Sequence, residues 1–321
     1  MPKRQPPAPI VESLAVAVSP ARAWDALTNP RFLGDIMMGH VELDARPGQP
    51  FVWKWGVWDE AAPGKGSHDW RGTVLDVVPG SMLILSGGAS TAVLTVNGEG
   101  NSSLITAVQM VTEPSAGEDF QYGWADFLLR VKTLLEPHPS GDALYLRTLM
   151  RATPAEVIGA WLSPTVMSKI LPGKVTLKAK PGGRFAWQWK HPKGAKNSGA
   201  FLEITKGRHV AFTWEGGPQP SEVRLSAERT PYGAFVSLEH LRLPPGASRR
   251  AIERMWAHLL ERLRVYFYFG KKIRAGKAAD ARNRLRSFES DAEKFFSTEP
   301  KAARKEARKF QKASMRSLRK D

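Results

Sequence analysis

Two short segments of this chain alternate large aromatic residues with other residues in the same way. In residues 51–55, FVWKW, the three aromatic side chains fall on one face of a predicted strand, while Lys54 lies on the other face. Residues 185–189, FAWQW, show the same alternation 134 positions later. Both patterns predict a strand with one face packed against a core.

The first 136 residues predict a strand, two short helices, six further strands and a long helix, in that order. Ser19-Pro20 and Asn29-Pro30 each supply a helix N-cap followed by proline at the first helical position. Strands are predicted from apolar alternation and turn residues at 10–18, 40–45, 51–57, 70–77, 82–86, 91–96 and 103–111. Apolar residues at spacings of three and four, including Trp124 and Leu128, then predict an amphipathic helix.

The second half of the chain repeats this order. A strand at 143–150 precedes Thr153-Pro154, six strands are expected between 174 and 241, and a long helix is expected from about 248 to 269. An offset of 134 relates Ser19-Pro20 to Thr153-Pro154, and Trp124 corresponds to Trp256. A period this long indicates two globular domains, because the repeats of a solenoid are about 20 to 50 residues long. The length of 321 residues agrees.

These motifs resemble the START-like (SRPBCC, helix-grip) superfamily. The resemblance rests on the Ser-Pro-x-x-x-Trp sequence from Ser19, the Pro-Gly-x-x-Phe-x-Trp strand, the Gly-x-Val-x-x-Val-x-Pro-Gly segment from Gly72, and the final helix with its tryptophan. The chain is most similar to the branch related to the C-terminal domain of the heat-shock-protein-90 ATPase activator. The superfamily includes carriers of hydrophobic ligands, cyclases and chaperone-binding modules.

We therefore predict an α+β protein with two tandem helix-grip domains, each a curved antiparallel sheet wrapped around a long C-terminal helix. The expected organisation is a disordered N-terminus at 1–9, domains at 10–136 and 143–270, a linker at 137–142, and a basic helical tail at 271–321.

Large apolar side chains on the inner strand faces and on the long helices surround the space between each sheet and its helix. They either form a packed core or line a cavity for a hydrophobic small molecule, and both interpretations stay open. The candidate cavity residues are Trp53, Trp55, Trp70, Trp124, Leu128, Trp187, Trp189, Phe212, Trp214, Trp256 and Leu260.

Positive charge is concentrated at the C-terminal end of the chain. The last 52 residues hold 17 lysines and arginines against 7 acidic residues, so they carry ten of the sixteen net positive charges. The pattern predicts two short basic helices, which either stay solvated or bind nucleic acid, an acidic protein partner or an anionic membrane surface. The candidate contact residues are Arg282, Arg284, Arg286, Arg304, Lys305, Arg308, Lys309, Lys312 and Arg316.

Little in the sequence points to catalysis, a metal or a cofactor. Cysteine is absent, and the seven histidines lack metal-site spacings. His68 and Asp69 are the best acid/base candidates, and His240 is expected to form a surface pair with Glu239. No apolar run resembles a signal peptide or an integral membrane segment.

The sequence thus predicts a non-enzymatic, cytoplasmic binding protein without a cofactor, whose domains bind a hydrophobic small molecule or a protein partner. Two alternatives remain. One is a regulator of a chaperone ATPase, as the resemblance implies, and the other is a nucleic-acid-binding protein that acts through the basic tail.

Overall fold

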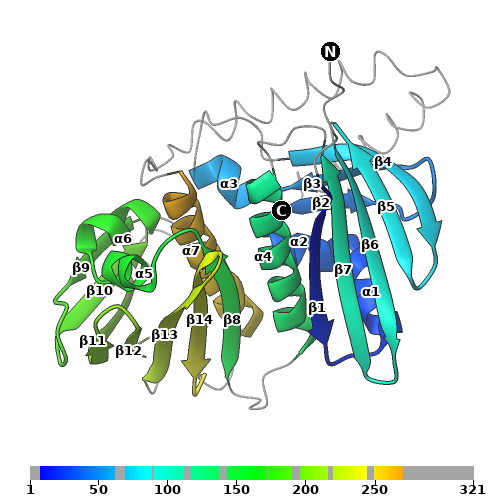
Figure 1. The fold of residues 1–321 in the computed structure, drawn as a ribbon. Helices are drawn as coiled ribbons and strands as arrows, with labels where there is room; N and C mark the ends of the chain where they lie inside the picture. Colours follow the sequence, from blue (N-terminus) through cyan, green and yellow to red (C-terminus); the bar gives the residue numbers. More distant parts are fainter. Residues whose placement is uncertain are drawn as a thin grey trace, which may run out of the picture. The chain divides into compact units, whose positions relative to one another are not determined.

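The computed structural model describes residues 8–61, 69–88, 90–111, 117–136, 143–171, 173–189, 196–215, 220–243 and 249–269. The described residues all belong to one compact unit, Met1–Ala275. The unit contains two seven-stranded sheets, each built from one half of the chain (Figure 1). The strand pairs of both sheets are antiparallel, so the predicted α+β fold with two tandem domains is confirmed.

The first domain has the sheet order β1-β7-β6-β5-β4-β3-β2. Its elements are β1 (Ile10–Val16), α1 (Pro20–Thr28), α2 (Pro30–Met37), β2 (His40–Leu43), β3 (Pro50–Lys54), α3 (Gly56–Ala61), β4 (Asp69–Val78), β5 (Met82–Gly87), β6 (Ser90–Glu99), β7 (Ser102–Val111) and α4 (Gly117–Leu135).

The second domain has the equivalent order β8-β14-β13-β12-β11-β10-β9. Its elements are β8 (Leu144–Met150), α5 (Pro154–Trp161), α6 (Pro164–Ile170), β9 (Gly173–Leu177), β10 (Arg184–Trp189), β11 (Lys196–Thr205), β12 (His209–Trp214), β13 (Ser221–Thr230), β14 (Gly233–Leu241) and α7 (Arg249–Tyr268).

The predicted caps start the short helices in both domains. The Ser19 hydroxyl accepts a hydrogen bond from the backbone N–H of Arg22, and the Asn29 side chain does the same for the first turn of α2. Thr153 and Glu156 form a reciprocal capping box at the start of α5. The equivalent helices therefore leave the two sheets at equivalent points.

Glycine occupies an equivalent strand position in both domains, because a backbone oxygen of the next strand lies against it. A Cβ atom on Gly72 of β4 would lie 1.8 Å from the Ser86 carbonyl oxygen, and one on Gly199 of β11 would lie 1.8 Å from the Thr213 carbonyl oxygen. No side chain fits at such a distance. Gly72 opens the Gly-x-Val segment of the first half, and Gly199 holds the equivalent position in the second, so strand packing requires glycine at both positions.

The strand predicted at 51–57 is shorter in the structure, and this part of the prediction was wrong. Strand β3 ends at Lys54, and α3 begins two residues later at Gly56. Val57 and Trp58 of α3 are buried, so the apolar run continues through a change from strand to helix. A short apolar run fits the period of a strand and the period of a helix, so it does not distinguish the two elements.

Helix α4 covers the free edges of both sheets, at β1 and at β8 (Figure 1). At β1, Lys132 Nζ donates to the Ala15 carbonyl at 2.7 Å, and the carboxylate of Glu136 accepts from the Ala17 N–H just beyond the strand at 2.7 Å. At β8, Asp126 and Tyr122 bind the backbone N–H and carbonyl of a single residue, Leu149, at 2.8 and 2.6 Å. These hydrogen bonds satisfy backbone N–H and C=O groups at the sheet edges, which could otherwise pair with another strand.

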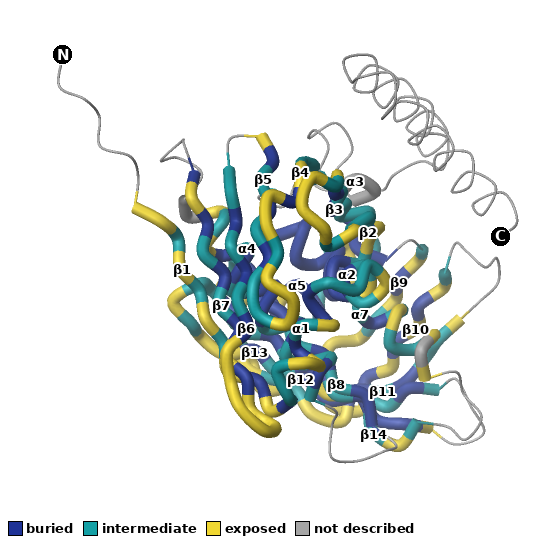
Figure 2. The backbone as a smooth tube through the Cα atoms, turned by 90° about the vertical axis from the view of Figure 1, so that its right-hand side faces the viewer, coloured by how far each residue is buried: buried dark blue, intermediate teal, exposed yellow. Residues whose placement is uncertain are grey.

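Each sheet packs its own apolar core, and the buried and exposed residues alternate along the strands (Figure 2). Trp58 belongs to the core of the second domain although it comes from the first, and Trp55 packs against both cores. Among the residues that the structure describes, no helix is long and apolar enough to cross a membrane.

Candidate functional site between the two domains

The predicted cavity residues of the first domain contact one another as a packed aromatic cluster. The Trp53 ring is stacked on Phe127 with a centroid distance of 5.6 Å. Trp70 and Trp124 approach Trp53 edge-on at 5.5 and 6.2 Å. Trp53, Trp124 and Leu128 are buried, whereas Trp55 and Trp70 are half-buried.

The second domain is filled in the same way. The Trp214 ring lies 4.8 Å from Trp256 and 5.3 Å from Trp187. Phe212 and Leu260 are also buried in this cluster, and Trp189 lies half-buried at its margin. The rings thus occupy much of the space that a ligand inside either domain would need.

A tryptophan of the long helix makes the same kind of hydrogen bond in both domains. Trp124 Nε1 donates to Gln109 Oε1 at 2.5 Å, and Trp256 Nε1 donates to His240 Nδ1 at 3.0 Å. Both acceptors are buried, Gln109 on β7 and His240 on β14, the last strand of each domain along the sequence. These bonds fasten each helix to its sheet, because a buried indole N–H needs an acceptor.

His240 is buried, so the predicted surface pair with Glu239 was wrong. Alternation along β14 turns His240 into the core, where its Nε2 lies 2.6 Å from Ser221 Oγ. Because Trp256 donates to Nδ1, the proton of the neutral ring sits on Nε2, which then donates to Ser221. Burial lowers the pKa of His240 to about 4. In this tautomer His240 is not placed to activate Ser221 as a nucleophile.

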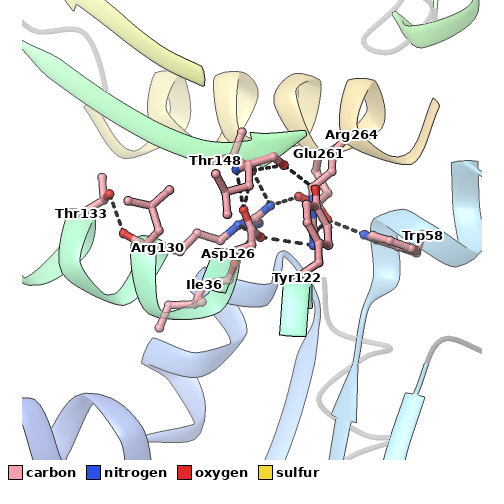
Figure 3. Close-up of polar contacts among 11 residues, drawn as sticks. Ile36, Trp58, Tyr122, Asp126, Arg130, Thr133, Thr148, Glu261 and Arg264 are labelled. Carbon is pink, nitrogen blue, oxygen red and sulfur yellow. Dashed lines mark hydrogen bonds and ion pairs between the residues drawn. The ribbon is translucent and has the colours of Figure 1, made fainter. Parts of the chain in front are cut away.

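A buried network of charges joins the two domains (Figure 3). Arg130 Nε of α4 lies 2.8 Å from Asp126, and Arg130 also forms an ion pair with Glu261 of α7. Arg264 of α7 lies 2.9 Å from Glu261 and 3.3 Å from Asp126. Thr148 of β8 accepts from Arg130 at 3.1 Å and donates to Asp126 at 2.9 Å. Two positive and two negative charges therefore balance within the interface.

The electrostatic environment keeps Glu261 and Arg264 of this network ionised. Burial alone would raise the pKa of Glu261, but the guanidinium groups of Arg130 and Arg264 outweigh it and hold the pKa at about 2. Burial would likewise lower the pKa of Arg264, but Asp126 and its neighbours raise it overall. The paired charges replace the water that each group loses.

Trp58 connects the network to α3. Its indole N–H donates to Glu261, and the Arg264 guanidinium lies 5.1 Å from the centroid of its ring. Tyr268 of α7 meets the same ring edge-on at 4.7 Å. The first domain thus inserts an aromatic side chain into the second, beside the buried charges.

A cleft of about 860 Å³ opens between the domains. Its walls come from α2 and the turn after it, α4, β8 and α7, with Trp189 at the end of β10. Phe32, Met38, Leu134 and Met255 present half-buried apolar surface to it. Of the eleven predicted cavity residues, Trp189 and Leu260 line this cleft.

The cleft also carries charge. Four arginines and two carboxylates line it. Arg254 of α7 reaches across to Asp35 of α2 at 3.4 Å, so this ion pair connects the two walls. The cleft thus combines apolar walls with a few polar groups, as small-molecule sites commonly do.

Sequence reasoning missed the charged residues of the interface. Asp126, Arg130, Glu261 and Arg264 were not singled out, because charges on a helix usually face solvent. One signal was available: residues 265–269, VYFYF, are five consecutive apolar residues on a helix, which indicates burial on every side.

Several predicted residues lie elsewhere. Asp69 forms an ion pair with its strand neighbour Arg71. His68, the linker and the entire basic tail, including Arg282 and Arg316, lie outside the described residues. The acid/base and nucleic-acid predictions therefore stay predictions.

Comparison with known proteins identifies the family. The sequence profile described as activator of Hsp90 ATPase homolog 1-like protein matches residues 17–136 and again residues 151–268. No curated protein is significantly similar to the chain.

Solved structures give low overall similarity scores. A protein from Chromobacterium violaceum is 20% identical over 40% of this chain and 98% of its own, with a TM-score of 0.36. The Aha1 dimer protein from Colwellia psychrerythraea is 17% identical over 40% and 98%, also with a TM-score of 0.36. DynU16, from the dynemicin biosynthetic locus, is 18% identical over 81% and 96%, with a TM-score of 0.35. Because the family profile matches most of the sequence in two successive regions, this chain belongs to the family of activator of Hsp90 ATPase homolog 1-like proteins and contains two copies of its domain.

Proposed function

We propose that the chain is a non-enzymatic binding protein that holds a hydrophobic small molecule in the cleft between its two domains. The observation that carries this proposal is the position of the cleft, which lies between two domains whose interiors are occupied by aromatic rings. A volume of about 860 Å³ lies in the range of small-molecule sites, about 300 to 1,000 Å³.

The apolar walls support this choice of ligand. Leu134 and Met255 come from the long helices of different domains, and Phe32 comes from α2. All three are half-buried, so a ligand seated between them would remove further apolar surface from water. Filling the cleft would also strengthen the contact between the domains.

The hydrogen bonding of the polar groups supports binding without catalysis. The buried carboxylates Asp126 and Glu261 are each paired with arginines, and His240 donates to Ser221. Among the described residues, no group of three or more histidines, aspartates or glutamates could hold a metal ion. A general base or a nucleophile would need a freer group than these.

The proposal is tested by blocking the cleft from either wall. Ala257→Trp on α7 and Thr133→Trp on α4 each place an indole in the cleft. We expect wild-type protein to bind the neutral apolar dye Nile red saturably at one site, and each variant to lose at least ten-fold in affinity. Native mass spectrometry of gently purified protein should show a bound small molecule in the wild type.

Ala21→Trp is the matched control, because it adds the same ring to an exposed position on α1. This variant should bind the dye as the wild type does, and circular dichroism should show that all three variants are folded. Unchanged saturable binding in both blocked variants would move the ligand site away from the cleft. Failure of the wild type to bind the dye, together with a clean apo mass, would refute the proposal.

A further inference from the structure

Arg147 of β8 lines the cleft, and its guanidinium group donates no hydrogen bond to another described residue. Its Nε atom is buried and has no hydrogen-bond partner. Its guanidinium group lies 4.2 Å from the centroid of the Tyr145 ring, which holds the group by a cation–π contact but accepts no conventional hydrogen bond. No ion pair joins Arg147 to another residue in the described part of the chain.

The other arginines of the cleft are engaged with the protein. Arg130 donates to the Ile36 carbonyl at 3.2 Å and belongs to the buried charge network. Arg254 pairs with Asp35, and Arg249 donates to the Ala143 carbonyl at 2.6 Å. Arg130 Nε likewise lacks a geometrically ideal hydrogen bond, but it lies 2.8 Å from Asp126 in an ion pair, whereas Arg147 has no ion pair with a described residue. Arg147 therefore differs from its neighbours, because a buried guanidinium atom without an acceptor is costly.

One carboxylate that senses the charge of Arg147 already accepts hydrogen bonds from other groups. Burial raises the pKa of Glu136, which follows α4, but its hydrogen bonds with Lys132 and Ala17 and, to a smaller extent, the charge of Arg147 lower it overall. Glu136 Oε1 accepts from Lys132 at 2.9 Å and from the Ala17 backbone at 2.7 Å. Arg147 therefore has no carboxylate partner of its own among the described residues.

We propose that the ligand of the cleft is an amphipathic anion whose carboxylate or phosphate group is bound by Arg147. Guanidinium groups bind these oxyanions through two parallel N–H donors. Leu146 beside Arg147 on β8 and Leu134 on α4 supply apolar surface for the rest of the molecule. This inference rests on the proposed function, because it names the chemical class of ligand for the same cleft.

The experiment compares three head groups attached to the same alkyl chain. Binding of dodecanoate, dodecyl phosphate and dodecanol, each below its critical micelle concentration, is measured by displacement of Nile red from the wild type. We expect at least one of the two anions to bind ten-fold or more tightly than dodecanol. Inorganic phosphate, which has the charge without the apolar chain, should bind far more weakly than dodecyl phosphate.

Arg147→Gln should abolish the preference for the anion and leave dodecanol affinity unchanged. Arg229→Gln, on an exposed position of β13, is the matched control and should keep the preference. Equal binding of dodecanoate, dodecyl phosphate and dodecanol by the wild type, or a preference that survives in Arg147→Gln, would overturn the anion assignment and leave the cleft as an apolar site. If the wild type bound neither Nile red nor dodecanoate, dodecyl phosphate or dodecanol, the proposed function would itself be refuted.

Discussion

Arg130 of the first domain and Glu261 of the second form an ion pair that is buried between α4 and α7. Arg262, which corresponds to Arg130 in the repeat, donates to the Ile170 carbonyl at the end of α6. Arg130 makes the equivalent bond to Ile36 at the end of α2, and in addition reaches Glu261. One arginine thus serves both its own domain and the contact with the other.

Removing the charge of Glu261 should destabilise the whole unit. In Glu261→Gln, Arg130 and Arg264 are left with Asp126 as the only carboxylate of the network. Breaking a buried ion pair from one side typically costs about 3 to 5 kcal/mol. We expect a loss of about 3 kcal/mol or more in the free energy of unfolding, measured by urea denaturation at pH 7.

The pH dependence gives a second check on Glu261. Its pKa in the folded protein, about 2, lies below the ordinary 4.5, so its contribution is complete above about pH 4.5 and is lost as the pH falls toward 2. The difference between wild type and Glu261→Gln should therefore shrink below pH 4.5. Glu228→Gln, at an exposed position of β13, should stay within about 0.5 kcal/mol of wild type. A similarly small effect of Glu261→Gln would contradict this account.

Trp58 comes from the first domain but should stabilise the second. In Trp58→Ala the indole that contacts Glu261, Arg264 and Tyr268 is lost, and a large cavity forms beside α7. We expect faster amide hydrogen exchange in peptides from residues 249–269, measured by mass spectrometry. Trp24→Ala, which removes a half-buried ring of α1, should leave this segment unchanged. Faster exchange confined to the first domain would show that Trp58 acts only locally.

The order of elements could be predicted because each signal was local. Ser19-Pro20 and Thr153-Pro154 start helices through hydrogen bonds to their own first turn, and the aromatic residues of β3 and β10 alternate within a single strand. The duplication then let each half support the interpretation of the other. Helix α3 escaped prediction because a short run of apolar residues fits both a strand and a helix.

The candidate site could be predicted only in part, because it depends on how the domains contact each other. Periodicity placed Trp189 and Leu260 on apolar faces, and both line the cleft. Arg147 and Glu261, in contrast, look like ordinary surface charges until a second domain covers them. The contact between the domains has no signal in the sequence comparable to the helix caps and the alternation within strands.

Two glycines should respond to alanine in opposite directions. Gly199→Ala would bring a Cβ atom to 1.8 Å from the Thr213 carbonyl oxygen, so the strands must separate, at a cost of about 2 kcal/mol or more. Gly159→Ala, on an exposed turn of α5 with open space around it, should stabilise by about 0.5 to 1 kcal/mol. Thermal denaturation of both variants distinguishes the two cases. A tolerated Gly199→Ala would mean that β11 and β12 are less closely packed than the structure shows.

His240 should make the protein sensitive to mild acid. Burial lowers its pKa from 6.5 to about 4, so the folded state takes up a proton less readily than the unfolded state. Its contribution to stability is therefore complete above about pH 6.5, and is lost as the pH falls toward 4. The difference between the two pKa values corresponds to about 3 kcal/mol.

The equivalent residue in the first domain suggests the variant for this test. Gln109 accepts from Trp124 where His240 accepts from Trp256, so His240→Gln keeps an acceptor for the indole and removes the titrating group. Between pH 7 and pH 4, the free energy of unfolding from urea titrations should fall by up to about 3 kcal/mol more in wild type than in His240→Gln. His40→Gln, at an exposed position, should follow the wild type. If wild type and His240→Gln lost stability in parallel, another group would have to account for the acid sensitivity.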